Sequence, residues 1–129
     1  MEIRDSCQRT WPATPSSVPV ARDFVADFLL ARVSSDVVEE ARLIASELAT
    51  NAVRHAGTPF TVTVELTDAD VTLRVRDGSS RVPVTQSPNR LADRGRGLVL
   101  VDALSVSWGT AAENDGGKSV WARFMAATS

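Results

Sequence analysis

Three polar side chains recur every four residues in the stretch SELATNAVRHA, residues 46–56. They are Glu47, Asn51 and His55, a carboxylate, an amide and an imidazole, and apolar residues lie between them. Because a helix advances about 100° per residue, the three positions drift only about 80° and form one stripe. By spacing alone such a stripe is more often a solvated helix face than one wall of a polar site.

Two common enzyme chemistries fit this sequence poorly. An HExxH zinc site needs two histidines, whereas His55 is the only histidine in the chain. A serine–histidine–aspartate triad would also depend on His55, and no GxSxG nucleophile motif occurs. We therefore do not expect a zinc protease or a serine hydrolase.

Asp77 stands at the end of a predicted strand and is followed directly by Gly78. The common role of such an aspartate is to open a turn. The alternative is a buried carboxylate that faces a cleft. A carboxylate only accepts hydrogen bonds, so it would pair with the N6 amine of adenine and repel the O6 of guanine.

The run Gly95-Arg96-Gly97-Leu98 resembles half of a GxGxxG motif, but Leu100 replaces the third glycine, so a dinucleotide fingerprint is a poor match. Glycines at the start of a helix leave free amides that suit phosphate oxygens. Arg94 and Arg96 would add charged contacts there, or they are solvated loop arginines.

Residues 117–119, Gly-Lys-Ser, match the tail of a P-loop, but Ala112 stands where the first glycine is needed. A strand is also expected after this tripeptide, where a P-loop needs a helix. We therefore reject a P-loop and expect Lys118 to be a lysine of a hairpin turn, with phosphate contact as the weaker alternative.

The elements that must position these residues follow from the hydrophobic period. Helices are expected from Ser16 or Ser17 to about Arg32, from a capping Asp36 to Gly57, and over 97–104; strands are expected over 9–13, 60–66, 71–77, 106–108 and 119–126. Residues 78–97 keep no period, which is typical of a functional lid or a disordered loop. The pattern predicts an α+β fold, with helices on one face of a mixed, mostly antiparallel sheet.

Length and charge limit the classes of function. The 129 residues predict one domain, and 14 basic against 16 acidic residues argue against a generic nucleic-acid binder. Cys7 is the only cysteine, which excludes an internal disulfide and fits a reducing cytoplasm. We see no signal peptide, and the longest apolar stretch, 24–33, is interrupted by Asp27 and Arg32, so no membrane span is expected.

The order of the motifs is more specific than any one of them. Glu47 and Asn51 on a helix come first, then Asp77-Gly78 at a strand end, and then Gly95-Arg96-Gly97-Leu98 at the start of a helix. This order resembles the N, G1 and G2 boxes of the GHKL ATPase superfamily with the Bergerat fold. Within it the chain is most similar to small anti-sigma-factor serine/threonine-kinase-like ATP-binding proteins, whose pattern is matched by SELATNAVRHA, VRDGSS and DRGRGLVLVDAL, and by WG followed by GKSVWARF. The resemblance covers about residues 10–125 of a single domain, 1–129.

The resemblance implies a two-layer α/β sandwich that holds ATP beneath a mobile lid, about residues 78–96. Asn51 would give its carbonyl oxygen to Mg²⁺, whose other ligands would be phosphate oxygens and waters. Asp77 would accept from adenine, and Glu47 would act as general base on an attacking hydroxyl or orient it. The other nucleotide contacts implied are His55, Gly78, Arg94, Gly95, Arg96, Gly97, Leu98 and Ser119.

By the same resemblance, the chain is expected to be a regulatory serine/threonine protein kinase. Its target would be an anti-sigma-factor antagonist and its client a sigma factor, and two copies of the chain would form a homodimer. One departure favours a catalytically weak ATP-dependent binding module instead. The G1 box of the family often runs Asp-x-Gly-x-Gly, whereas here Asp77 is followed directly by Gly78 and then by Ser79, and the second glycine is missing. A detached histidine-kinase core fits the sequence poorly, since no dimerisation helix with a phosphoacceptor histidine precedes the motifs.

Overall fold

The computed structural model describes residues 2–79 and 96–127. Within these ranges five strands form one sheet in the order β1-β2-β3-β5-β4, and each of the four pairings is antiparallel. The elements are β1 (Asp5–Trp11), α1 (Ser17–Leu30), α2 (Ser35–His55), β2 (Phe60–Leu66), β3 (Asp70–Asp77), α4 (Arg96–Leu104), β4 (Ser107–Ala112) and β5 (Lys118–Met125). The predicted α+β class is confirmed, with an antiparallel sheet where a mixed one was expected.

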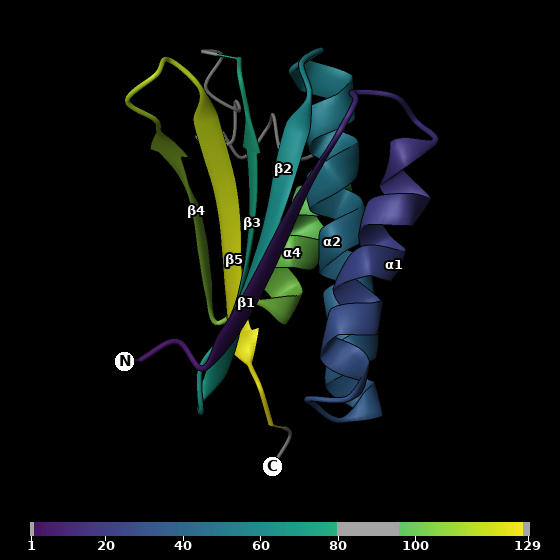
Figure 1. Cartoon of the computed structure of the whole chain (residues 1–129), viewed down its shortest axis with the longest axis vertical. Coiled ribbons are helices and arrows are strands. Elements are labelled where there is room, and N and C mark those ends of the chain that lie inside the picture. The colour runs from purple at the N-terminus through teal and green to yellow at the C-terminus, as the bar shows by residue number, and fades with distance from the viewer. Residues whose placement is uncertain (1, 80–95, 128–129) are drawn as a thin grey trace.

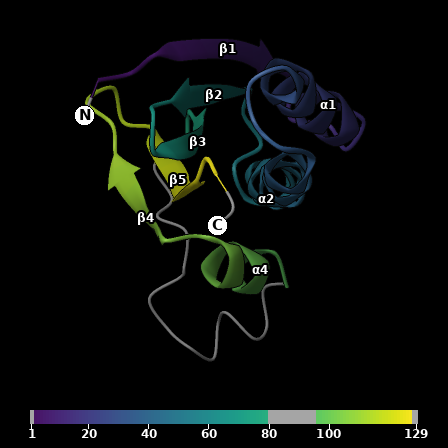
Figure 2. The ribbon, with the colours of Figure 1, turned by 90° about the horizontal axis from the view of Figure 1, so that it is seen from below.

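The helices α1, α2 and α4 lie on the same face of the sheet (Figures 1 and 2). Alternate residues of β2 and β3 point toward them, because successive side chains of a strand face opposite sides. The helix α2 supplies the other half of the core, and α1 and α4 pack against it. The largest fully buried side chains of this core include Phe60, Phe124, Leu29, Ile44, Leu48, Leu73 and Val101.

The boundaries of α2 differ from the prediction at one end only. Ser34 is the N-cap, and its side chain accepts a hydrogen bond from the Val37 amide, whereas Asp36 lies in the first helical turn. A carboxylate there still complements the helix dipole. At the other end Gly57 has a φ of +68°, as expected for a glycine that terminates a helix.

The strand β1 was predicted at residues 9–13 but occupies Asp5–Trp11. Its polar residues carry no clear alternation, and its position is decided by pairing with β2, from Asp5 opposite Leu66 to Trp11 opposite Phe60. The register of an edge strand depends on its neighbour, which sequence periodicity does not reveal.

In the described part of the chain, no helix is both long and apolar enough to cross a membrane.

Gly117 allows the β4–β5 turn to approach the end of β3. A Cβ atom at Gly117 would lie 2.3 Å from the backbone oxygen of Asp77. We therefore expect Gly117→Ala to destabilise the fold by about 1–3 kcal/mol, because the backbone must shift to relieve the overlap. Gly78→Ala is the matched control in denaturant unfolding, since its Cβ would make only an ordinary contact, 3.5 Å from Thr58 Oγ1. Equal stabilities of the two variants would contradict this account.

Candidate functional site

Asp77 is the last residue of β3 and is buried, with only 3% of its surface exposed. It lies in phase with Val75, Leu73 and Val71 and so faces the helices. A carboxylate at such a position needs a partner, because burying an unpaired charge is strongly unfavourable. The structure thus shows a buried carboxylate at a strand end.

The partner of Asp77 is Lys118, directly opposite it on β5. The lysine Nζ lies 3.0 Å from Oδ1 and 2.8 Å from Oδ2 of the carboxylate, and only 4% of Lys118 is exposed. The expectation of a hairpin-turn lysine was wrong. Lys118 begins β5 and is in phase with the buried Val120 and Ala122, a pattern already visible in KSVWAR.

Ser79, which follows Gly78 in the shortened G1 box, also bonds to this carboxylate. The amide of Ser79 donates to Asp77 Oδ1 at 2.8 Å, which is an aspartate turn of the i to i+2 type. Among the described residues, Oδ1 therefore accepts from both Ser79 and Lys118, whereas Oδ2 accepts only from Lys118. Since a carboxylate oxygen accepts about two hydrogen bonds, Oδ2 can take one further donor.

A hydrogen bond ties the end of β3 to the segment that follows α2. The Gly78 amide donates to Thr58 Oγ1 at 2.9 Å, and Thr58 lies three residues beyond His55, the last residue of α2. The C-terminal end of α2 and the end of β3 accordingly lie together at the top of the molecule in Figure 1. The sequence analysis did not identify Thr58 as a contact of Gly78. The only local signal there is Pro59, which indicates a turn.

The stripe on α2 is half covered. Glu47, Asn51 and His55 are each partly buried, and Leu48 and Ala52 beside them are fully buried. A solvated face would leave such side chains exposed. The stripe instead borders the core at the end of α2 that approaches β3, which is compatible with one wall of a polar site.

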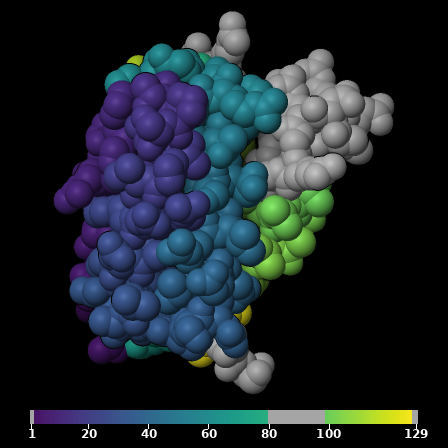
Figure 3. Space-filling view, turned by 90° about the vertical axis from the view of Figure 1, so that its right-hand side faces the viewer, coloured from purple at the N-terminus to yellow at the C-terminus, as the bar shows by residue number. Residues whose placement is uncertain are grey.

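The helix α4 packs against α2 and lies beside it in the space-filling view of Figure 3. Its first turn contains Gly97 and Leu98, and this end of α4 is the one nearer the top of Figure 1. The backbone amides of a first helical turn have no partner within the helix. In Figure 1, the start of α4 is also the end of this helix that lies closer to the C-terminal end of α2.

The structure does not place every predicted site residue in this group. Arg94, Gly95 and most of the predicted lid, as well as the side chain of Arg96, lie outside what the structure describes. Ser119 is fully buried, but strand alternation places it on the sheet face opposite to Lys118 and Asp77. Ser119 thus stands apart from the group at the end of β3.

The turn between β4 and β5 is held by charged contacts. Arg76 pairs with Asp115 and, at 3.2 Å, with Glu113. A hydrogen bond from the Gly117 amide, together with Arg76, holds the pKa of Asp115 below its usual value. A lowered pKa stabilises the folded state above the unfolded pKa of about 3.9, and this contribution is lost as pH falls through the folded value.

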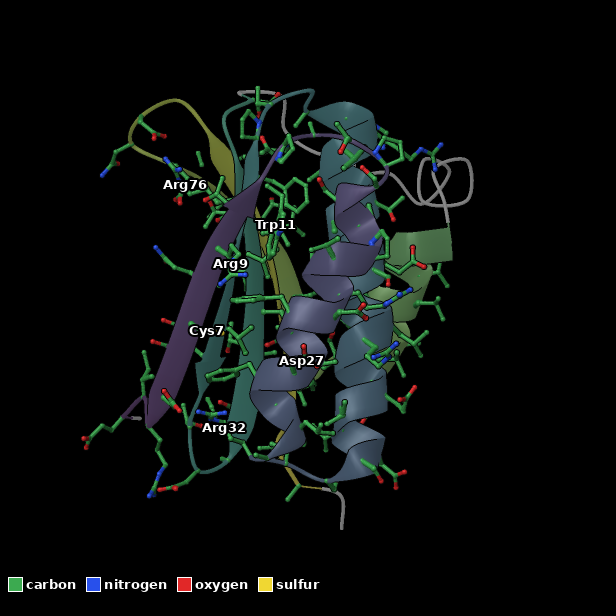
Figure 4. The ribbon with its side chains drawn as sticks, turned by 45° about the vertical axis from the view of Figure 1, so that its right-hand side comes forward. Cys7, Arg9, Trp11, Asp27, Arg32 and Arg76 are labelled. Atoms are coloured by element: carbon green, nitrogen blue, oxygen red, sulfur yellow. The ribbon has the colours of Figure 1, made fainter. Side chains whose placement is uncertain are left out.

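A separate groove of about 470 Å³ lies between β1 and α1 (Figure 4). Its lining includes the aromatic rings of Trp11, Phe24 and Phe28, and Arg9 lies over the ring of Phe24. Burial raises the pKa of the Cys7 thiol in this groove above its ordinary value. None of the predicted nucleotide contacts lines it, so it is distinct from the group around Asp77.

The buried Asp77–Lys118 pair makes a testable contribution to stability. We expect Lys118→Met to destabilise the fold by about 3–5 kcal/mol, because the variant leaves a buried carboxylate without its partner. The double variant Asp77→Asn/Lys118→Met removes both charges and should recover most of this loss. Urea unfolding measures both effects, and an unchanged midpoint for Lys118→Met would contradict a buried pair.

The described residues contain no group of three histidine, cysteine or acidic side chains that could hold a metal ion. A metal that takes most of its ligands from a phosphate compound needs no such group. A single amide oxygen, such as that of Asn51 on the half-buried stripe, fits a metal of this kind.

Comparison with known families places these features in one context. Residues 11–124 match the histidine kinase-like ATPase domain, a range that includes the α2 stripe, Asp77, the start of α4 and Lys118. The comparison with curated proteins found no match.

Proposed function

The chain belongs to the histidine kinase-like ATPase domain family, and from this premise we propose that it is a regulatory ATP-binding protein. The observation that carries the proposal is the buried Asp77, whose strand end is joined to the segment that follows α2 by the bond from Gly78 to Thr58. The ATP would lie between α2, the end of β3 and the first turn of α4.

The adenine and the phosphates of ATP each have candidate partners in this arrangement. The free position on Asp77 Oδ2 accepts one hydrogen of the adenine amine. The amides at Gly97 and Leu98 donate to phosphate oxygens at the start of α4. His55, Arg94, Gly95 and Arg96 are proposed as further phosphate contacts, on the resemblance of their motifs.

The proposal includes one protein ligand for Mg²⁺. The amide oxygen of Asn51 would bind the ion, and phosphate oxygens and waters would complete its coordination. Bound Mg²⁺ would neutralise charge on the phosphates. The partly buried position of Asn51 suits this role, because a nearby core limits the motion of its side chain.

We further propose that the protein is a serine/threonine kinase of the anti-sigma-factor type. Glu47 lies one helical turn before Asn51 and would accept the proton of a substrate hydroxyl. The hydroxyl oxygen then bonds to the γ-phosphorus, while the bond from that phosphorus to the β–γ bridging oxygen breaks and ADP leaves. The expected substrate is a small antagonist protein, and the expected client is a sigma factor.

The alternative is an ATP-dependent binding module without phosphotransfer, which the shortened glycine box favours. Incubation with labelled ATP and candidate antagonist proteins separates the two. Transfer of label supports the kinase, whereas no transfer under conditions of demonstrated ATP binding supports the module. A single domain over 1–129, a lid at about 78–96, a homodimer and a cytoplasmic location remain parts of the proposal.

The direct test of nucleotide binding is a thermal shift. We expect Mg-ATP to raise the melting temperature more than Mg-GTP, because a carboxylate accepts from the amine of adenine and repels O6 of guanine. At 100 times Kd a ligand adds about 2.7 kcal/mol of stability, which is easily detected. Asp77→Asn should lose most of the ATP shift, and no shift with either nucleotide in the wild-type protein would refute the proposal.

A further inference from the structure

Lys118 has no role in the proposed function so far, yet it is the polar side chain closest to the acceptor assigned to adenine. We propose that Lys118 is a specificity-determining residue, whose ammonium donates a hydrogen bond to the purine ring nitrogen beside the 6-amino group. That nitrogen is N1 or N7, according to which edge of adenine meets Asp77. This inference rests on the proposed ATP site.

The hydrogen-bond count supports this role. An ammonium group has three donors, and in the described part of the chain the hydrogen bonds of Lys118 go only to the two oxygens of Asp77. The third donor is thus available, in a group with 4% exposure. A buried donor left without an acceptor is unfavourable, so a ligand acceptor at this point would be favoured.

The pair also presents a pattern that matches adenine. Asp77 Oδ2 has one acceptor position left, and the Lys118 nitrogen, which bonds to this oxygen at 2.8 Å, also carries the available third donor. Adenine presents the complementary pair, a donor on its 6-amino group beside an acceptor on N1 or N7. One aspartate alone recognises only the amine, whereas the pair recognises both atoms.

Stability alone gives little reason to keep a lysine here. The other buried positions of the same β5 face are Val120, Ala122 and Phe124. Replacing a buried ion pair by packed apolar residues is often neutral or stabilising. A ligand that uses both members of the pair provides a physical reason for one lysine in an otherwise apolar row.

Titration calorimetry with ATP, 1-deaza-ATP and 7-deaza-ATP tests the inference on the wild-type protein. One of the two analogues should bind about 10- to 100-fold more weakly than ATP, the range expected for a lost hydrogen bond to a charged group. Lys118→Met should bind ATP more weakly and should no longer distinguish that analogue from ATP. Arg76→Met is the control, because it removes a neighbouring cation from the opposite face and should keep the wild-type discrimination.

A merely structural lysine would weaken all three nucleotides by the same factor in Lys118→Met and leave their ratio unchanged, which would overturn the inference. Equal binding of ATP and both analogues by the wild-type protein would also overturn it, even if the variant failed to fold. Either result leaves the proposed ATP site intact. A wild-type protein that bound no ATP would refute the proposed function and this inference together.

Discussion

Replacement of Asn51 by alanine is expected to lower Mg-dependent ATP affinity by about 100-fold or more, while the protein stays folded. The variant removes the only proposed protein ligand of the metal, and a factor of 100 corresponds to about 2.7 kcal/mol of binding free energy. The fold should survive, because Asn51 is only partly buried and alanine is a good helix former. Calorimetry with and without Mg²⁺ measures the effect.

Asn114→Ala is the matched control for this experiment. Asn114 is exposed in the turn between β4 and β5, so the same chemical change there should leave affinity unaltered. Wild-type affinity in Asn51→Ala, or equal losses with and without Mg²⁺, would exclude the metal role of Asn51. Circular dichroism of both variants separates lost binding from lost structure.

Replacement of Glu47 by glutamine is expected to leave ATP binding within about threefold of wild type and to reduce phosphotransfer by about 10²- to 10⁴-fold. Glutamine has nearly the same shape as glutamate but does not accept a proton. Affinity should persist, because the proposed contacts of ATP with Asp77 and the start of α4 do not involve Glu47. Single-turnover transfer of labelled phosphate measures the chemical step separately from binding.

Glu40→Gln is the matched control, because Glu40 lies two helical turns before Glu47 and is also partly buried. It should keep wild-type transfer. If Glu47→Gln transferred phosphate at the wild-type rate, another group would have to be the base. If the wild-type protein bound ATP but transferred nothing to any antagonist, the binding module would replace the kinase as the proposed function.

Asp77 shows how far a local pattern can indicate a site. The alternation of VTLRVRD predicts both the strand and its buried face, so the burial of Asp77 follows from periodicity. The same holds for α2, where the apolar period and Gly57 predict the helix and its end. These features depend on neighbours in sequence, which is why the sequence alone determined them.

Lys118 shows what sequence neighbours do not determine. Its alternation with Val120 indicated a buried position, but only the antiparallel pairing of β3 with β5 shows that Asp77 is opposite it. The bond from Gly78 to Thr58 and the extent of β1 likewise depend on segments distant in sequence. The sequence alone therefore determined most helices and strands and the motif residues on them. The tertiary structure determined which of these residues contact one another, because strand register and helix packing bring together groups that no local period relates.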